Sequence, residues 1–215
     1  MFSQIYGYYL EHIGEYWSDV AAHLEISFGV AALAALIGIP LGIVCALYPK
    51  HSGWITGLVN VMRIIPSLAL MLLMIPLIGI GRVPAFIALM IIAIPPVLIN
   101  TTAGFLKTDS ALLETAGGMG MDQKQIFRKV QFPLAIPLIF TGIRTSIVET
   151  IASATIATYI GAGGLGNLVF TGLGTSRTYI TLLGGLTIAL ISIVTDCILA
   201  VVQSRLVRRF GMEEV

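Results

Sequence analysis

Four charged residues lie inside otherwise apolar stretches of this 215-residue chain, namely Arg63, Arg144, Glu149 and Asp196. A charge at the middle of a membrane helix costs about 2.5–3.5 kcal/mol unless it is paired or hydrated. At a helical rise of about 1.5 Å per residue, three of these charges share a layer about 12–15 Å from one membrane face, and Glu149 lies about 8 Å beyond it. We therefore expect Asp196 to pair with Arg63 or Arg144, and Glu149 to lie on a different helix face from Arg144. The pair could orient helices, gate a pathway or contact a solute.

A proline and two polar residues in the same apolar stretches are candidate groups of a pathway. Pro66 has no N–H and so removes the helical hydrogen bond to the carbonyl of Met62. Broken membrane helices are tolerated where they line a cavity, which makes Ser67 and the nearby backbone candidates, although a simple kink without function is an equal alternative. Asn100 is a weaker candidate, because a hydrogen bond between helices explains it better.

The longest polar stretch, residues 106–132, is too short and too polar to span a membrane. Asp109 or Ser110 is an N-cap candidate, and apolar residues follow at helical spacing. We expect a short helix that lies across the membrane surface. It carries the acid Glu114 beside small residues that would let another protein backbone approach closely. These small residues are Ala116, Gly117, Gly118 and Gly120.

The composition requires a lipid environment for much of the chain. Hydrophobic residues make up 57% of it and charged residues only 11%, whereas soluble domains carry about 25% charged residues. The net charge of +1 argues against nucleic-acid binding, which calls for a clustered basic face. Cys45 and Cys197 lie in apolar runs without further metal ligands nearby, so we expect buried thiols and no metal site.

Five stretches are long and apolar enough to cross a membrane as helices, each of which needs about 20 residues. The chain is thus predicted to be a single all-α membrane domain over residues 1–215, with a tail over 205–215. Residues 1–20 lack the basic residues of a cleavable signal peptide and are expected to form an interfacial segment. Gly38 and Gly42 form a G-x-x-x-G pair that favours close helix packing. The predicted spans are Leu24–Tyr48, Ile55–Ile78, Pro84–Phe105, Leu134–Ile160 and Tyr179–Ser204.

Lys and Arg residues are shared unevenly between the two sides of the membrane. With the N-terminus outside, eight fall on inner segments, and only Arg82 and Arg177 fall outside. Inner loops of membrane proteins carry an excess of positive charge. The sequence therefore predicts an external N-terminus, a cytoplasmic C-terminus and a cytoplasmic loop at 106–132. The eight inner residues are Lys50, Lys107, Lys124, Arg128, Lys129, Arg205, Arg208 and Arg209.

The cytoplasmic loop carries the pattern E-T-A, three residues, G, nine residues, V-Q-F-P, which ends at Pro133. It resembles the motif E-A-A, three residues, G, nine residues, I-x-L-P of permeases of binding-protein-dependent ABC importers. Thr115, Val130 and Phe132 depart from that motif conservatively. The resemblance implies a coupling helix that docks in a groove of an ATPase subunit, with Pro133 at the start of the next helix, where its missing N–H costs nothing. The implied docking residues are Glu114, Thr115, Ala116, Gly117 and Gly120.

Other segments narrow the resemblance to permeases of quaternary-amine (osmoprotectant) importers. Residues 65–70 (IPSLAL), 75–81 (IPLIGIG), 95–101 (PPVLINT) and 142–145 (GIRT) are similar to that group. The resemblance implies transport of a compatible solute such as glycine betaine, carnitine or choline. Residues 161–166 (GAGGLG) are also similar to methionine-importer permeases, so a methionine or other amino-acid importer is the alternative.

The resemblance also implies partners. Five helices hardly enclose a pathway, so we expect a second permease chain, identical or homologous, with two cytoplasmic ATPase subunits and an external solute receptor at a bacterial cell membrane. The chain has no G-x-x-x-x-G-K-[ST] motif, so it is expected to be no enzyme and to need a separate ATPase. Gly161, Gly163 and Gly166 match G-x-G-x-x-G without the flanking strand and acid of a dinucleotide site. We expect no cofactor there, but a flexible outer loop where two copies of the chain meet.

Two other functional classes are weaker alternatives. An ion channel would need a selectivity filter or a ring of like charges, and the sequence shows neither. An intramembrane enzyme would need a catalytic constellation within a span, but His12, His23 and His51 all fall near the predicted span ends.

Overall fold

The computed structural model describes residues 1–210, apart from the side chains of 49–51, so the last five residues of the predicted tail lie outside the described part. The described residues form helices and connecting turns without a β-strand. The helices are α1 (Phe2–Glu11), α2 (Ile13–Leu47), α3 (Pro49–Ile64), α4 (Ser67–Ile78), α5 (Arg82–Leu106), α6 (Ser110–Gly118), α7 (Gln123–Ile126), α8 (Phe132–Ala157), α9 (Gly166–Gly174) and α10 (Thr178–Phe210), with a π-helical turn at Phe127–Gln131 and a 3₁₀ turn at Thr158–Ile160.

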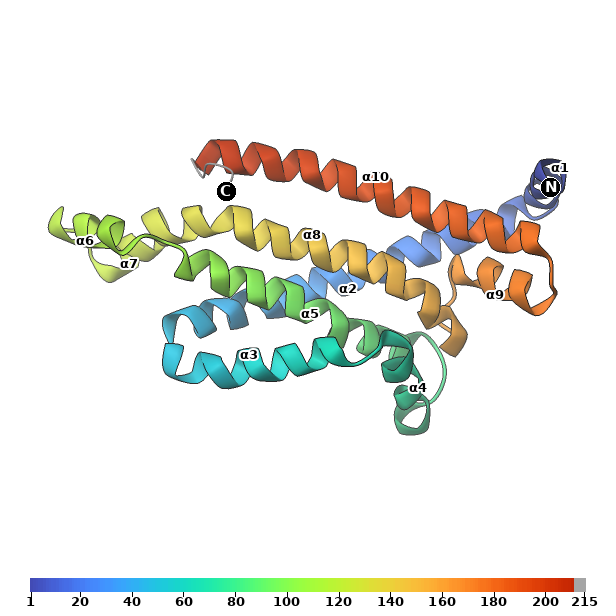
Figure 1. Cartoon of the computed structure of the whole chain (residues 1–215), viewed down its shortest axis with the longest axis horizontal. Helices are drawn as coiled ribbons and strands as arrows, with labels where there is room; N and C mark the ends of the chain where they lie inside the picture. Colours follow the sequence, from blue (N-terminus) through green and yellow to red (C-terminus); the bar gives the residue numbers. More distant parts are fainter. Residues whose placement is uncertain (211–215) are drawn as a thin grey trace.

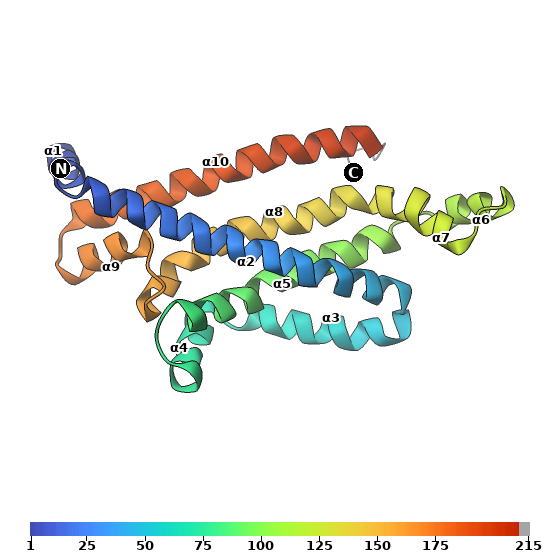
Figure 2. The same cartoon turned by 180° about the vertical axis from the view of Figure 1, so that it is seen from behind.

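The long helices α2, α5, α8 and α10 run along the length of the molecule (Figure 1). Helix α5 packs against both α2 and α8, and α10 packs on α8. The α2–α3 turn, α6, α7 and the end of α10 lie at one end, whereas the N-terminus and α9 lie at the other (Figures 1 and 2). The polar loop and the beginning of the chain are therefore at opposite ends of the bundle.

Hydropathy and length make four of these helices candidate membrane spans, and a bent pair of helices makes a fifth. The bent pair is α3 and α4, which meet at an angle of 95°. The prediction of an all-α membrane bundle of about five spans is confirmed. The span predicted over Ile55–Ile78 is broken at the proline that was expected to interrupt it, because Ile65 and Pro66 adopt extended backbone. Proline cannot donate the hydrogen bond that would continue a helix, so the chain turns there.

Small residues let helices α2, α5 and α8 approach one another closely. A Cβ on Gly42 of α2 would lie 2.6 Å from the Cβ of Thr101 on α5, and one on Gly142 of α8 would lie 2.8 Å from the carbonyl of Pro96. Polar side chains close the remaining gaps, because Ser146 of α8 donates a hydrogen bond to the carbonyl of Ala93. The close packing predicted for the G-x-x-x-G pair is confirmed.

Helix α10 presents its apolar face to the outside of the bundle. Leu186, Leu190 and Ile193 each leave about 60% of their surface exposed. Cys45 is buried as predicted, but Cys197 is exposed on this helix, which corrects the expectation for that thiol. An exposed apolar face of this kind is typical of contact with lipid or with another protein.

The glycine-rich segment 161–166 is packed into the bundle rather than exposed. Ala162 and Leu165 are buried, and Gly164 touches His23 of α2. The segment lies at the same end of the bundle as the N-terminus, but it is packed between α8 and α9 instead of forming the loose loop that was expected. Helix α2 begins at Ile13, well before the predicted start of the span, so His23 lies within it. The side chain of His23 is fully buried and donates from Nε2 to the carbonyl of Ile151.

Candidate functional site

Helix α6 is capped at both ends by specific hydrogen bonds. Its N-cap is Asp109, whose carboxylate accepts a hydrogen bond from the N–H of Ala111 at 2.9 Å. At its end the N–H of Gly120 binds the carbonyl of Gly117, and the N–H of Met121 binds that of Ala116. This pair of bonds closes a helix only when the residue after the cap adopts a left-handed conformation, and Gly120 has φ +83°. The glycine is thus required by the turn.

The surface of α6 projects beyond the end of the bundle (Figure 1). Glu114 and Gly117 are exposed, and a Cβ on Gly117 would meet no atom within 4 Å. The hydroxyl of Thr115 donates to the carbonyl of Ala111, and Ala116 is buried beneath the helix. Of the predicted docking residues only Ala116 is therefore buried, and the others are exposed.

Pro133 lies in the first turn of α8, as predicted. This helix continues α7 and the turn between them, so that helical structure runs without a break from Gln123 to Ile160. The wider π-helical turn at Phe127–Gln131 precedes the proline, and the N–H of Phe132 bonds to the carbonyl of Phe127. A π turn gives space for the proline ring inside a continuing helix.

An aromatic cluster fixes this turn to the bundle. The rings of Phe127 and Phe105 stack with centroids 5.5 Å apart, and Phe132 lies 6.1 Å from Phe127. Phe105 is buried and lies in the last turn of α5. The loop and the core are therefore joined by direct packing as well as by the chain.

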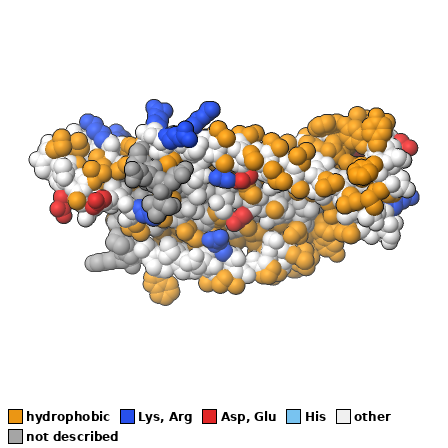
Figure 3. All heavy atoms as spheres, turned by 45° about the horizontal axis from the view of Figure 1, so that its top comes forward, with side chains coloured by type: hydrophobic (Ala, Val, Ile, Leu, Met, Phe, Trp, Pro, Cys, Tyr) orange, Lys and Arg blue, Asp and Glu red, His pale blue; other side chains and the backbone are white. Residues whose placement is uncertain are grey.

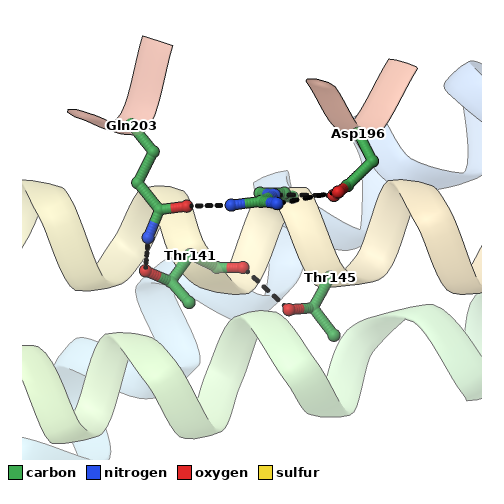
Figure 4. A network of polar contacts seen from close by, with 5 residues as sticks. Thr141, Thr145, Asp196 and Gln203 are labelled. Atoms are coloured by element: carbon green, nitrogen blue, oxygen red, sulfur yellow. Dashed lines mark hydrogen bonds and ion pairs between the residues drawn. The ribbon is translucent and has the colours of Figure 1, made fainter. Parts of the chain in front are cut away.

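Arg144 and Asp196 form a closed ion pair between α8 and α10 (Figure 4). Two hydrogen bonds, of 2.7 and 2.8 Å, join the guanidinium to the carboxylate. The guanidinium also donates to Gln203, whose amide donates to the hydroxyl of Thr141, both at 2.8 Å. A bidentate pair of this kind is geometrically specific as well as strong. The expected pairing of Asp196 is thus confirmed, and Arg144 is its partner.

Arg63 pairs with Glu149, at 3.9 Å, and lies apart from the layer expected for it. The prediction measured its depth from Ile55, whereas α3 begins at Pro49, six residues earlier. Six residues correspond to about 9 Å of helix, which raises Arg63 to the level of Glu149. The intramembrane charges therefore form two separate ion pairs at two depths.

Two neighbouring grooves open beside these pairs. One, of about 390 Å³, lies between α8 and the α3–α4 break, and Arg63, Ser67 and Glu149 line it. The other, of about 290 Å³, is lined by Thr141, Thr145, the closed ion pair and again by Glu149. Glu149 borders both grooves and shares the second one with Arg144. The two side chains therefore do not lie on different faces of α8, as was expected.

The grooves follow a polar stripe on α8, which consists of Thr141, Thr145, Val148, Glu149, Ala152 and Ser153. From one helical turn to the next these positions are three or four residues apart, with adjacent pairs at 148–149 and 152–153, so they share one helix face. Figure 3 shows charged side chains of both signs in the middle of a face that is otherwise mostly uncharged. A stripe of small, polar and charged residues contrasts with the Leu and Ile of α10 and suits contact with water.

The predicted pathway residues differ in their positions. Pro66 and Ser67 line the larger groove at the start of α4, where no side chain caps the first turn. Asn100 lines neither groove, and its amide donates to the carbonyl of Pro96 in its own helix. The structure therefore gives no support to a pathway role for Asn100.

Sequence reasoning missed several residues of the grooves. Gln203 and Thr141 complete the closed pair, and Ser153 lies in the larger groove. Spacing could have found the first two, because Gln203 follows Asp196 by seven residues, about two helical turns, and Thr141 precedes Arg144 by three. Among the described residues no cluster of three metal-ligating side chains occurs.

The sequence is similar to transport permeases over most of its length. It is 39% identical over 193 residues to the choline transport system permease protein OpuBB of Bacillus subtilis, which covers 90% of this chain and 89% of that protein. It is 37% identical to the glycine betaine/carnitine/choline transport system permease protein OpuCB of the same organism, over 94% of both chains. The osmoprotectant import permease protein OsmW of Salmonella typhimurium is 36% identical over 89% of this chain and 92% of its own.

The fold is similar to solved transporter structures. An inward-facing MetNI methionine ABC transporter has a chain with a TM-score of 0.77 at 22% identity, covering 93% of this chain and 98% of that one. An amino acid ABC transporter with histidines has a TM-score of 0.67 at 23% identity, over 93% and 96% of the two chains. At these identities the likeness concerns the fold alone.

Residues 38–208 match the family described as binding-protein-dependent transport system inner membrane component. The match covers the broken span, the exposed α6 and both grooves. The chain is thus a multi-pass inner membrane protein without an ATPase site of its own, and its family works with ATP-binding subunits and a solute-binding protein. The chain belongs to the family of inner membrane components of binding-protein-dependent transport systems.

Proposed function

We propose that this permease conducts a compatible solute such as glycine betaine, carnitine or choline. The names of the relatives support this solute class, since they are choline, carnitine and osmoprotectant permeases at 36–39% identity. The observation that carries the mechanism is one continuous helix, Gln123–Ile160. It begins beside the exposed α6 and carries the polar stripe along its middle, so it connects a docking surface directly to a pathway.

The mechanism is alternating access without covalent chemistry in this chain. Two ATPase subunits dock on the α6 helices of two permease copies, identical or homologous, and a receptor delivers the solute at the other end. ATP-driven closure of the ATPases pushes α6, and the push passes through Phe127 and Phe105 into α8 and α5. The grooves of two copies face each other, because one chain leaves them open on one side.

We further propose that the N-terminus is external and the C-terminus cytoplasmic. The end that holds the α2–α3 turn, α6, α7 and the end of α10 carries eight of the twelve Lys and Arg residues of the chain. An excess of positive charge on cytoplasmic segments supports this orientation. It places α6 where a cytoplasmic ATPase reaches it.

Affinity purification of the tagged chain from native membranes, in mild detergent, tests the assembly. We expect an ATPase subunit to co-purify, and we expect Glu114→Gln combined with Gly117→Val to remove it. Glu15→Gln, which changes an exposed acid near the opposite end, is the matched control and should retain the ATPase. Recovery of the chain without an ATPase, from membranes that also contain the other subunits, would favour a channel.

A further inference from the structure

The two ion pairs that border the grooves differ in how completely their charges are satisfied. Arg144 and Asp196 are joined by two hydrogen bonds. The nearest atoms of Arg63 and Glu149 are 3.9 Å apart, and no hydrogen bond joins these two side chains. The first pair is closed, whereas the second keeps donors and acceptors free for another group.

The free groups of the open pair, Arg63 and Glu149, border a groove of about 390 Å³. Pockets for small molecules hold about 300–1,000 Å³, so this one fits a small solute. Ala152 and Ser153 lie one turn beyond Glu149 on the same helix and keep the space beside its carboxylate unobstructed. About half of the Arg63 side chain and more than a third of Glu149 are exposed.

The chemistry of the lining selects the ligand. A quaternary ammonium has no N–H to donate, so it is recognised by a carboxylate or by aromatic faces. None of the described residues that line this groove is aromatic, which leaves Glu149 as the anionic group. A carboxylate on the solute would need charged hydrogen-bond donors, which Arg63 supplies. The hydroxyl of Ser67 lies on the same wall of the groove as a further donor.

We propose that Arg63 and Glu149 form a recognition site within the pathway for a small zwitterion that carries a carboxylate and a quaternary ammonium. Arg63 binds the carboxylate, and Glu149 faces the ammonium. Each charge of the open pair then gains an opposite partner, so the exchange leaves no charge unpaired. This inference rests on the proposed function, because it places that solute class at a defined site.

The test is uptake by the reconstituted complex of permease, ATPase and receptor in proteoliposomes. Radiolabelled glycine betaine, which has a carboxylate, is compared with choline, which has none, and receptor affinity for each is measured separately. We expect Arg63→Gln to reduce the uptake of glycine betaine relative to choline by about tenfold, and Arg63→Lys to restore part of the ratio. Glu149→Gln should reduce the uptake of both solutes by about tenfold, because both carry the quaternary ammonium.

The matched control removes an ion pair of the same types from the outer end of the bundle. Arg82 and Glu25 lie 2.8 Å apart, and Arg82→Gln should leave the ratio of the two solutes unchanged. An Arg63→Gln complex that assembles and keeps the wild-type ratio would overturn the site. A wild-type complex that accumulates neither solute with ATP would instead overturn the proposed function.

Discussion

Asp196 and Arg144 show what a single pair of residues contributes to this bundle. Their carboxylate and guanidinium join the lipid-facing α10 to α8, which carries the polar stripe. Because the pair is only partly exposed, each charge depends on the other more than a surface pair would. The pair therefore holds α10 against α8.

Replacing Asp196 with Asn should lower the stability of the permease by about 1–2 kcal/mol, because a charged hydrogen-bonded partner is lost. Thermal unfolding of the detergent-purified complex, followed by size exclusion, measures the change. Arg144→Gln in the same chain should recover part of the loss, since no lone charge then remains. Unchanged stability and transport in Asp196→Asn would mean that the pair contributes nothing.

Gly120 has a role that follows from its backbone rather than from a contact. Its φ of +83° disfavours residues with a Cβ by about 1–2 kcal/mol, and Asn is tolerated better than Ala. We expect co-purification of the ATPase to decline in the order Gly, Asn, Ala and Val at position 120. Gly118→Ala is the control for backbone strain, because Gly118 is the last residue of α6 and a Cβ there meets no atom within 4 Å. A Val variant that binds the ATPase like wild type would contradict this role.

At the scale of elements, the sequence predicted the long spans better than the breaks. Apolar length identified α2, α5, α8 and α10, because each exceeds the thickness of a bilayer. Pro66 was recognised as an interruption, but the 95° turn depends on how α4 packs against α5 and α8. The depth of Arg63 depended on where α3 begins, which apolar residues alone did not reveal.

The close contact of α2 and α5 supports a prediction of its own. Gly42→Ala would place a Cβ 2.6 Å from Thr101, and overpacking of this kind costs about 1–3 kcal/mol. We expect a lower melting temperature of the purified permease. The control Gly57→Ala on α3 adds a Cβ that meets no atom within 4 Å, so it should not destabilise the protein. Equal stability of the two variants would contradict the close packing of α2 on α5.

At the scale of the whole molecule, the proposed function uses both ends of the bundle and the side on which the grooves open. The short helix α6 was predicted from the residues themselves, since it is local structure with its own cap and stop, whereas its coupling role comes from the resemblance to the permease motif. The pairing of Arg63 with Glu149 could not be predicted, because it depends on which helices meet across the bundle. The packed segment 161–166 was missed for the same reason.

The central claim is that this chain forms the pathway of an ATP-driven importer. The most direct measurement is accumulation of radiolabelled glycine betaine in proteoliposomes that contain the chain, its co-purified ATPase and the receptor. We predict uptake against the gradient that requires ATP and receptor and that is lost when α6 carries Glu114→Gln with Gly117→Val. Solute flux that runs only down its gradient, equally fast without ATP, would contradict the account and indicate a channel.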